Sequence, residues 1–364
     1  MKKIICIVSK MDAGGAETFL MKMYRNIDRQ KYQFHFIVSD NSKGFYDDEI
    51  KSMGGRILYS PMKSENFWGN IASVYRILKS DDYYGVLKMG SHSLATIELL
   101  IARFIGIKKI ILRSTNADNS GSKITKILHN IFIFLPKYIP NVKIAPSDLA
   151  AKNMFGDKCL EKNEVVLLKN GLNLREYRFD VKRREILRNY LGINNSFVIG
   201  HIGRFSKQKN HEFLINVFNQ IQFIHKDVVL LLIGKGELED KIKESAKKYG
   251  IYNKIKFLGV RSDVPDLLMA MDAMLFPSLY EGMPNVVIEA QAAGVPCIIS
   301  DKITKQVVLT PFIKMESIGD KEKWVECFNQ LRSCNYNRDI GAQILRNKGY
   351  DIEDVTKVFE NLIF

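Results

Sequence analysis

Two acidic residues flank a possible anion site in the stretch from Pro277 to Pro296. Glu281 lies in a turn and Glu289 about one turn into the helix expected after it, with seven residues between them. Pro284 stands near the first helical position, where its missing N–H costs nothing. We therefore expect free backbone N–H groups from Met283 to Val287, at a helix start that binds phosphate through these donors and its dipole.

The two carboxylates could bind sugars. A carboxylate can accept hydrogen bonds from two neighbouring sugar hydroxyls, so Glu281 and Glu289 could hold two different sugars on either side of a diphosphate. Alternatively, Glu281 only complements the helix dipole and Glu289 is solvated, which would give ~0.3–1 kcal/mol of helix stability and no function. The spacing alone leaves both interpretations open.

A cationic pair follows the apolar run from Phe197 to Ile202. Arg204 and Lys209 are five residues apart in the loop that begins at Gly203, and a helix is expected from His211. These cations could stabilise a diphosphate leaving group as its bond to a sugar breaks, and no metal would then be required. They could instead be two surface cations, but the helix-opening context favours the diphosphate interpretation.

Two glycine loops give weaker signals. Gly14 and Gly15 open the first expected helix and let a ligand approach the backbone closely. The stretch from Gly234 to Glu237 follows another apolar run, but two glycines can simply make a turn. The G-x-G-x-x-G spacing of a dinucleotide fingerprint is absent.

Short apolar runs that read as buried strands alternate with helical stretches along the chain. The expected strands are 4–8, 34–38, 86–89, 109–112, 143–145, 197–202, 228–233, 255–258, 273–276 and 296–300. This alternation predicts an α/β protein with two doubly wound parallel-sheet domains. The candidate ligand-binding loops would share the carboxyl edge of the second sheet, where such folds hold ligands.

A turn-forming cluster from Asn170 to Asn173 predicts the boundary between the domains. We expect an N-terminal domain over residues 1–172 and a C-terminal domain over residues 173–345. Residues 346–364 should end in a helix, about Ile352 to Ile363, that packs back on the first domain because no strand follows it.

Composition limits the class of protein. The 364 residues are 46% hydrophobic and 26% charged, which fits a folded two-domain chain rather than a disordered one. The five cysteines are scattered and form no C-x-x-C pair, so we expect neither a disulfide framework nor a zinc site, and a reducing cytoplasm is favoured. The apolar run after Met1 is too short for a signal peptide, and no run is long enough to span a membrane.

The net charge of +14 is uneven: residues 1–170 carry +10 and residues 171–364 carry +4. A basic first half could attract an anionic membrane surface or nucleic acid, and no nucleic-acid motif is found, so we expect no nucleic-acid partner. The stretch from Ser122 to Lys143 mixes lysines with apolar residues. It could lie on a membrane surface or form a core helix with solvated lysines.

Together these residues resemble the retaining, nucleotide-sugar-dependent glycosyltransferases of family four, whose GT-B architecture has two Rossmann-like domains facing across a cleft. The resemblance spans nearly the whole chain. The first residues of the chain look most like those of bacterial capsular and exopolysaccharide members of the family. It rests on Glu281 with Glu289, Arg204 with Lys209 after Gly203, Gly14-Gly15-Ala16-Glu17, the stretch 44–49 and the hinge-like Asn170-Gly171.

The resemblance implies roles for these residues. Arg204 and Lys209 would stabilise the donor diphosphate, Glu289 would hold the ribose hydroxyls, and Glu281 would lie beside the transferred sugar. The base would lie against Val260 and Arg261, and the diphosphate would be approached by Gly14 and Gly15. Contacts to the sugar and phosphate are implied for Gly282, Met283, Pro284, Asn285, Val286 and Val287.

Some positions depart from the family pattern. Asn210 and Asn173 stand where many members have glycine and aspartate, and both changes look tolerable. Related sequences often have histidines where this chain has Arg113 and Thr115. His92 is the best candidate for the first-domain histidine near the transferred sugar, although a lone histidine is more often an ordinary satisfied residue.

The resemblance implies sugar transfer from a nucleotide-diphosphate sugar, UDP-linked by expectation, to a glycan or lipid-linked acceptor in surface polysaccharide synthesis. No metal or other cofactor is expected, and the place would be the cytoplasm or the inner face of the cell membrane. The alternatives are a nucleotide-sugar epimerase or hydrolase of the same architecture and a non-catalytic two-lobed sugar-binding protein.

Overall fold

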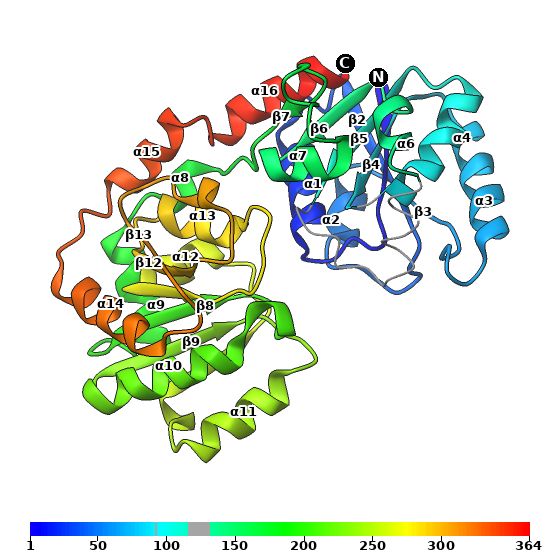
Figure 1. The fold of residues 1–364 in the computed structure, drawn as a ribbon. Coiled ribbons are helices and arrows are strands. Elements are labelled where there is room, and N and C mark those ends of the chain that lie inside the picture. Colours follow the sequence, from blue (N-terminus) through cyan, green and yellow to red (C-terminus); the bar gives the residue numbers. More distant parts are fainter. Residues whose placement is uncertain (92, 116–131) are drawn as a thin grey trace. The chain divides into compact units, whose positions relative to one another are not determined.

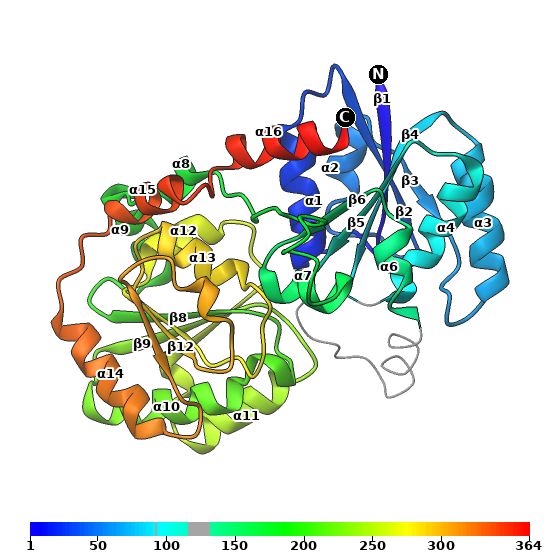
Figure 2. The ribbon, with the colours of Figure 1, turned by 45° about the horizontal axis from the view of Figure 1, so that its top comes forward.

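Parallel strands alternate with helices in both halves of the chain, which confirms the predicted α/β class (Figures 1 and 2). The computed structural model describes residues 1–91, 93–115 and 132–364. These form two units: unit 1 contains Met1–Leu172 and Asp351–Phe364, and unit 2 contains Asn173–Tyr350. The chain enters unit 2 within the expected turn and returns to unit 1 at Asp351, later than the expected residue 346.

Unit 1 is built on a parallel sheet with the strand order β3-β2-β1-β4-β5-β6-β7. Its described strands are β1 (Lys2–Ile7), β2 (Tyr32–Val38), β3 (Ile57–Tyr59), β4 (Tyr83–Gly90), β5 (Lys109–Ser114), β6 (Val142–Ala145) and β7 (Val166–Leu167). Its described helices are α1 (Gly15–Asn26), α2 (Asp47–Ser52), α3 (Phe67–Lys79), α4 (Ile97–Ile105), α6 (Leu135–Tyr138), α7 (Asp148–Phe155) and α16 (Ile352–Ile363), with a 3₁₀ turn at Ser93–Thr96.

Both faces of this sheet are buried, since successive strand residues point to opposite sides. In β1, Ile4 and Cys6 belong to a core shared with α1 and α16, whereas Ile5 and Ile7 belong to a core shared with α3, α4 and α7. A strand that is buried on both faces must be almost entirely apolar, which is why these strands could be recognised as apolar runs in the sequence.

The C-terminal helix α16 packs on unit 1, beside α1 (Figure 2). Its Val355, Phe359 and Ile363 join the core of α1, and the ring of Phe359 meets that of Phe19 edge-on with 6.0 Å between centroids. The backbone N–H of Ile352 donates to the carbonyl of Leu172 at 2.9 Å. The two segments that connect the units therefore run side by side within unit 1.

Unit 2 is built on a second parallel sheet, with the order β10-β9-β8-β11-β12-β13. Its strands are β8 (Phe197–Ile202), β9 (Val228–Ile233), β10 (Ile255–Gly259), β11 (Ala273–Phe276), β12 (Cys297–Ser300) and β13 (Ile313–Glu316). Its helices are α8 (Leu174–Tyr177), α9 (Val181–Leu191), α10 (His211–Ile224), α11 (Glu239–Lys248), α12 (Val264–Ala270), α13 (Asn285–Ala292), α14 (Lys321–Ser333) and α15 (Ile340–Asn347), with 3₁₀ turns at Lys207–Lys209, Tyr252–Lys254 and Lys305–Val307.

Helices α10, α11 and α14 share one core of unit 2 with alternate residues of its strands, around Trp324 and Phe328. Gln291, on α13, is fully buried. Its amide donates to the carbonyl of Val307, and its Oε1 accepts the N–H groups of Leu309 and Thr310 at 2.9 Å. These hydrogen bonds fix α13 and the loop after β12 in place.

The strands β3, β7 and β13 were not predicted from the sequence. They are only two to four residues long and lie at or next to the sheet edges, so they offer too few residues for a period of two to be recognised. The stretch from Ser122 to Lys143 lies outside the described residues as far as residue 131. Within its described part, Leu135–Tyr138 form the short helix α6, and the stretch ends in strand β6.

The assignment of α16 changes the distribution of charge. Residues 351–364 hold one lysine and four acidic residues, so the net charge of unit 1 is +7 rather than the +10 of residues 1–170, and unit 2 also carries +7. The two units therefore do not differ in net charge. None of the described helices is long and apolar enough to span a bilayer.

Candidate active site

The candidate residues of unit 2 follow four neighbouring strands. Gly203 follows β8, Gly234 follows β9, Val260 follows β10 and Pro277 follows β11, and these strands are adjacent and parallel in the sheet. Their carboxyl ends therefore meet along one edge. Backbone hydrogen bonds join the loops, from the Gly234 N–H to the carbonyl of Gly259 and from the loop after β11 to the loop after β8, both at 2.8 Å.

Gly234 lets two of these loops touch. Its φ of +135° is a conformation that side chains rarely adopt, and a Cβ there would lie 2.2 Å from the carbonyl oxygen of Gly203. The weak Gly-Lys-Gly signal is thus explained by a backbone contact, because only glycine permits this approach. The contact holds the loop of Arg204 and Lys209 against the end of β9.

Lys209 and Glu281 form an ion pair in this edge. Lys209 Nζ lies 2.6 Å from Glu281 Oε1, and the side chains are only 17% and 13% exposed. The stem of Lys209 crosses Gly203, where an added Cβ would lie 3.1 Å from Cδ and Cε. A cation and an acid from two separate loops therefore meet, as the sequence predicts for one common site.

The Lys209–Glu281 pair rests on a layer of aromatic rings formed by Phe276, His201, His211 and Phe205. Lys209 Nζ lies 4.7 Å from the ring centroid of Phe276, at the end of β11, and His201 stacks on that ring. The ring of His211 lies against both His201 and Phe205, with centroid separations of 4.6 and 4.3 Å. Burial lowers the pKa of His201 to about 4 and that of His211 to about 2, so both rings are neutral beneath the lysine.

Arg204 is placed differently from Lys209. Its side chain is 74% exposed, and its Nη2 pairs with Glu237 Oε2 at 3.2 Å, in the loop after β9. It lies in the same edge but is paired with Glu237 rather than with Glu281. Its role toward a diphosphate remains a prediction.

The start of α13 differs in detail from the prediction. Pro284 is the N-cap residue, one position before the first helical residue, Asn285. The N–H of Val287 donates to the carbonyl of Pro284 at 3.1 Å, so the expectation of a free donor there is wrong. The reason is that the first turn closes on the cap residue itself. Gly282 and Pro284 are buried, and Met283, Asn285 and Val286 are half-buried.

Glu289 points to a residue that spacing did not identify. Tyr177, on α8, is only 6% exposed, and its hydroxyl interacts electrostatically with the Glu289 carboxylate. Burial first, and then the charges of Glu289 and Glu176, hold the pKa of Tyr177 well above its usual value. The solvated alternative for Glu289 therefore does not describe the structure.

Val260 and Arg261 follow β10 on the same edge. Val260 is 48% exposed, and the Arg261 guanidinium is held in a bidentate pair by Asp263, with distances of 2.8 and 2.6 Å. Asp263 raises the pKa of Arg261. An exposed apolar side chain beside a fixed planar cation suits a heterocyclic base, which stays a prediction.

The glycine loop of unit 1 is as expected in position. Gly14 is the N-cap of α1 and Gly15 its first residue. The carboxylate of Glu17 covers Gly14, since an added Cβ would lie 2.3 Å from Glu17 Oε2, and burial raises the pKa of Glu17. His92, the candidate histidine, lies outside the described residues.

Arg113 stands at the carboxyl end of β5, where related sequences often have histidine. It is 2% exposed, donates to the side chain of Asn170, and lies over the ring of Phe19 at 3.7 Å. Burial lowers its pKa to about 9. The arginine therefore ties the sheet of unit 1 to the connecting segment.

Within the described ranges, no group of three or more His, Cys, Asp or Glu side chains is arranged to hold a metal ion.

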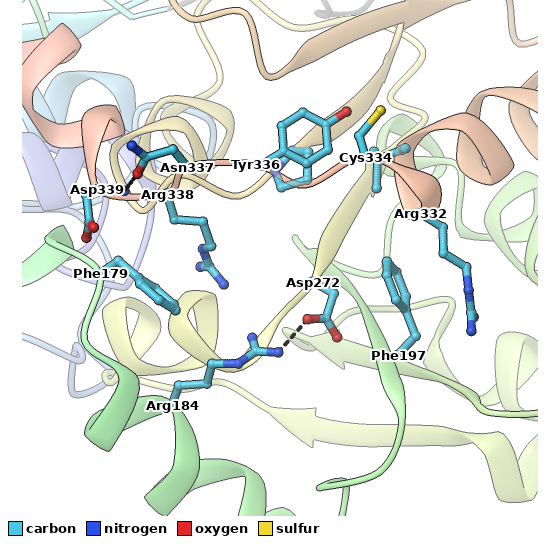
Figure 3. A pocket seen from close by; sticks show the side chains of 12 residues that line it. Phe179, Arg184, Phe197, Asp272, Arg332, Cys334, Tyr336, Asn337, Arg338 and Asp339 are labelled. Atoms are coloured by element: carbon cyan, nitrogen blue, oxygen red, sulfur yellow. Dashed lines mark hydrogen bonds and ion pairs between the residues drawn. The ribbon is translucent and has the colours of Figure 1, made fainter.

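A cavity of about 400 Å³ lies at the opposite edge of the unit 2 sheet (Figure 3). Phe197, Asp272 and Pro296, at or just before the starts of their strands, line it, together with Arg184 and Arg338. Arg184 donates to Asp272, and Arg338 donates to the backbone carbonyls of Leu268, Met271 and Ala293. Their donors are thus used within the protein, and the cavity is separate from the candidate site.

The fold has close structural relatives. The chain superposes on the structure of HepE from Anabaena in complex with UDP and glucose with a TM-score of 0.82, covering 99% of both chains at 18% identity. With the two parallel-sheet units, this defines the fold as that of the GT-B glycosyltransferases. Residues 183–314 match the model of the glycosyl transferases group 1.

The relatives in sequence identify the family. The chain is 31% identical over 362 residues to a putative glycosyltransferase, EpsF, of Bacillus subtilis (strain 168), covering 97% of this chain and 94% of the relative. It is 22% identical to a UDP-Gal:alpha-D-GlcNAc-diphosphoundecaprenol alpha-1,3-galactosyltransferase of Escherichia coli, covering 79% and 76%. The protein belongs to the group 1 glycosyltransferases and is a transferase. The resemblance to GT-B glycosyltransferases of polysaccharide biosynthesis is confirmed.

Proposed function

We propose that the protein transfers a sugar, with retention of anomeric configuration, from a UDP-sugar to a hydroxyl of a lipid-linked glycan during synthesis of a bacterial surface polysaccharide. The observation that carries this proposal is the Lys209–Glu281 pair at the carboxyl edge of unit 2. The relative from Escherichia coli supports the UDP donor and the diphospholipid-linked acceptor. A capsular polysaccharide biosynthesis glycosyltransferase of Staphylococcus aureus, 25% identical, supports the pathway class.

The pair suggests how a donor would bind. Glu281 neutralises Lys209, so neither charge is buried alone. A sugar diphosphate could replace this contact with two others, phosphate oxygen on Lys209 and sugar hydroxyls on Glu281. Arg204 would add charge at the solvent side, and Glu289 would accept the ribose hydroxyls. Val260 and Arg261 would face the base.

In the proposed step the bond between sugar C1 and the diphosphate oxygen breaks, and the acceptor oxygen bonds to C1 on the same face. The acceptor proton passes to an oxygen of the leaving diphosphate. Lys209 and Arg204 would stabilise the charge that develops on the diphosphate. This assignment requires no metal, so activity should persist in excess EDTA. Loss of activity on chelation would reject that part of the proposal.

The first test is transfer by Glu281→Ala. We expect transfer from UDP-galactose or UDP-glucose to a diphospholipid-linked N-acetylglucosamine to fall at least about 1,000-fold, since a contact at the reacting sugar is lost. The thermal unfolding curve should stay that of a folded protein. Glu212→Ala, which removes an exposed acid of α10 paired with Lys241, should transfer as the wild type does.

An active Glu281→Ala variant would remove the assignment of Glu281. Isomerised or hydrolysed donor sugar without acceptor, at the rate of transfer, would favour the epimerase or hydrolase alternative. Binding of a free sugar without nucleotide, and no turnover, would favour the two-lobed binding protein. Family membership favours transfer over both.

A further inference from the structure

Two lysines and a glutamate form a cluster in unit 1. Lys63 Nζ lies 2.9 Å and Lys88 Nζ lies 3.2 Å from the same carboxylate oxygen, Glu98 Oε1. The side chain of Glu98 is only 3% exposed, whereas those of Lys88 and Lys63 are 12% and 29% exposed. No sequence motif identifies this cluster, because its members come from three separate elements.

The cluster lies at the carboxyl edge of the unit 1 sheet. Lys88 is near the end of β4, Lys63 follows β3, and Glu98 is in the first turn of α4. Lys88 alternates with Val86 along β4, so it points to the sheet face that α3 and α4 cover, and these two helices pack together (Figures 1 and 2). Open parallel sheets hold ligands at this edge.

Positive charge is in excess in the cluster. Burial raises the pKa of Glu98, but the charges of Lys88 and Lys63 outweigh burial, so this pKa lies below its ordinary value and the acid is ionised. Both ammonium groups lie against Oε1, and Glu98 Oε2 is buried with no hydrogen-bond partner in the described part of the chain. One carboxylate therefore balances only one of two lysines.

Lys63 is the member that a ligand can reach. An ammonium group has three N–H donors. One N–H of Lys63 donates to the carbonyl of Leu94 at 3.3 Å, and the ammonium faces Glu98 on another side. Among the described residues this leaves one N–H, on a partly exposed side chain, for an anion. Lys209 and Glu281 form a similar pair at the carboxyl edge of unit 2.

The loop of Lys63 leads into an exposed aromatic pair. The loop closes as a turn, since the N–H of Asn66 donates to the carbonyl of Met62 at 2.9 Å, and Asn66 caps α3. Phe67 and Trp68, the first residues of α3, are 42% and 77% exposed, and their rings meet edge-on with 5.3 Å between centroids. A cation followed by exposed rings suits a ligand with a charged group next to an apolar chain.

We propose that Lys63, held in place by Glu98, binds the diphosphate of the lipid-linked acceptor. The inference rests on the proposed function, in which the reaction involves two diphosphates. Lys209 and Arg204 would neutralise the diphosphate of the donor, so the acceptor requires a cation of its own. Lys88 keeps Glu98 paired when Lys63 turns to the ligand. The family resemblance assigns no role to these three residues.

The test compares two acceptors in transfer assays of the full-length protein with UDP-galactose or UDP-glucose. One acceptor carries N-acetylglucosamine on a diphospholipid, and the other carries the same sugar on an uncharged alkyl chain of equal length. Lys63→Gln should raise KM for the diphospholipid acceptor about 10-fold or more, as expected when a hydrogen bond between charged groups is lost. Its kcat, its KM for the donor and its transfer to the alkyl acceptor should stay within about 2-fold of the wild type.

Three further variants complete the test. Lys63→Arg keeps the charge and should restore a low KM for the diphospholipid acceptor. Lys79→Gln is the matched control, because it removes an exposed lysine from the other end of α3 and should leave both acceptors unaffected. If Lys63→Gln fails to fold, Lys63→Met keeps the apolar stem of the side chain and should raise the same KM.

An equal rise in KM for both acceptors would overturn the inference and leave Lys63 a structural residue. An unchanged KM for the diphospholipid acceptor, or the same rise in Lys79→Gln, would overturn it too. A wild type that uses the two acceptors equally well would reject the anion site but not sugar transfer. A wild type that transfers to neither acceptor would reject the proposed function, and the inference with it.

Discussion

At the scale of single residues, the positive charge of Lys209 is balanced by an ion pair, and the histidines next to it are uncharged because they are buried. Lys209 Nζ lies 2.6 Å from Glu281 Oε1. The imidazoles of His201 and His211, in the aromatic layer under Lys209, stay neutral because they are buried. A protonated histidine there would repel the lysine. The histidines therefore link the integrity of the candidate site to pH.

This link predicts acid sensitivity. The folded-state pKa of His211 is depressed to about 2, below the ordinary value of about 6.5. Between these two pH values His211 is protonated in the unfolded chain but neutral in the folded chain. The stability contributed by the neutral ring is fully present above about pH 6.5 and is lost as the pH falls. His211→Phe should therefore lose about 2 kcal/mol less than the wild type between pH 7 and pH 5.

Urea unfolding at the two pH values, followed by the fluorescence of buried Trp324, measures this loss in unit 2. The substitution removes no hydrogen bond of the ring that the structure records. His225→Gln is the control, since His225 keeps a partner in Asn329 at 2.8 Å, and it should behave as the wild type. An unchanged pH dependence in His211→Phe would contradict the account.

At the scale of elements, the site is made by loops that touch at the ends of parallel strands. The contact of Gly234 with the Gly203 carbonyl joins the loops after β9 and β8. It fixes Lys209 relative to the sheet, because the stem of Lys209 crosses Gly203. Changes in this contact should therefore act on binding as well as on stability.

Gly234→Ala tests this dependence. The added Cβ would lie 2.2 Å from a backbone oxygen, and the φ of +135° is unfavourable for alanine, so we expect a loss of about 3 kcal/mol or more. UDP affinity should fall at least about 10-fold as Lys209 moves. Gly250→Ala is the matched control: its φ is +70° and nothing lies within 4 Å of an added Cβ.

The control should lose only about 1 kcal/mol and bind UDP normally. Trp324 fluorescence and calorimetric titration measure the two effects separately. Equal losses of stability and affinity in both variants would show that the loop contact has no special role.

At the scale of the whole molecule, net charge does not distinguish the units, but exposed apolar side chains mark one surface of unit 1. Leu100 and Phe104 lie one turn apart on α4, and Phe104 is 85% exposed. Arg103 donates to the carbonyl of Tyr138 at 2.7 Å, which places the 72% exposed Tyr138 of α6 next to them. Lys108 adds a nearby exposed cation.

Aromatic rings with flanking cations suit an anionic interface, so we predict that this surface binds anionic vesicles. The full protein should sediment with vesicles of phosphatidylcholine and phosphatidylglycerol, and less so with pure phosphatidylcholine or in high salt. Phe104→Ser should reduce binding several-fold. Phe223→Ser removes a 77% exposed ring from unit 2 and should have no effect. Equal binding by the two variants would contradict the prediction.

The sequence by itself determined the architecture and the loops of the site. Buried parallel strands must be nearly continuous apolar runs, so β8, β9 and β11 could be recognised in the sequence. Loops that follow neighbouring parallel strands must lie at one edge of the sheet. The convergence of the cations after β8 and the acids after β11 on one edge could therefore be expected before any coordinates, whereas the direct pairing of Lys209 with Glu281 could not. The helix expected at about Ile352 to Ile363 is found there, because one face repeats at helical spacing.

Only the tertiary structure decided the partners that lie far apart in sequence. Tyr177 and Glu289 are separated by more than a hundred residues, and neither spacing nor periodicity encodes a contact between two helices. The return of α16 to unit 1 likewise equalised the two net charges, which a count along the chain had divided as +10 and +4. Local patterns reflect which face of an element is buried, whereas contacts between distant elements depend on how the whole chain is packed.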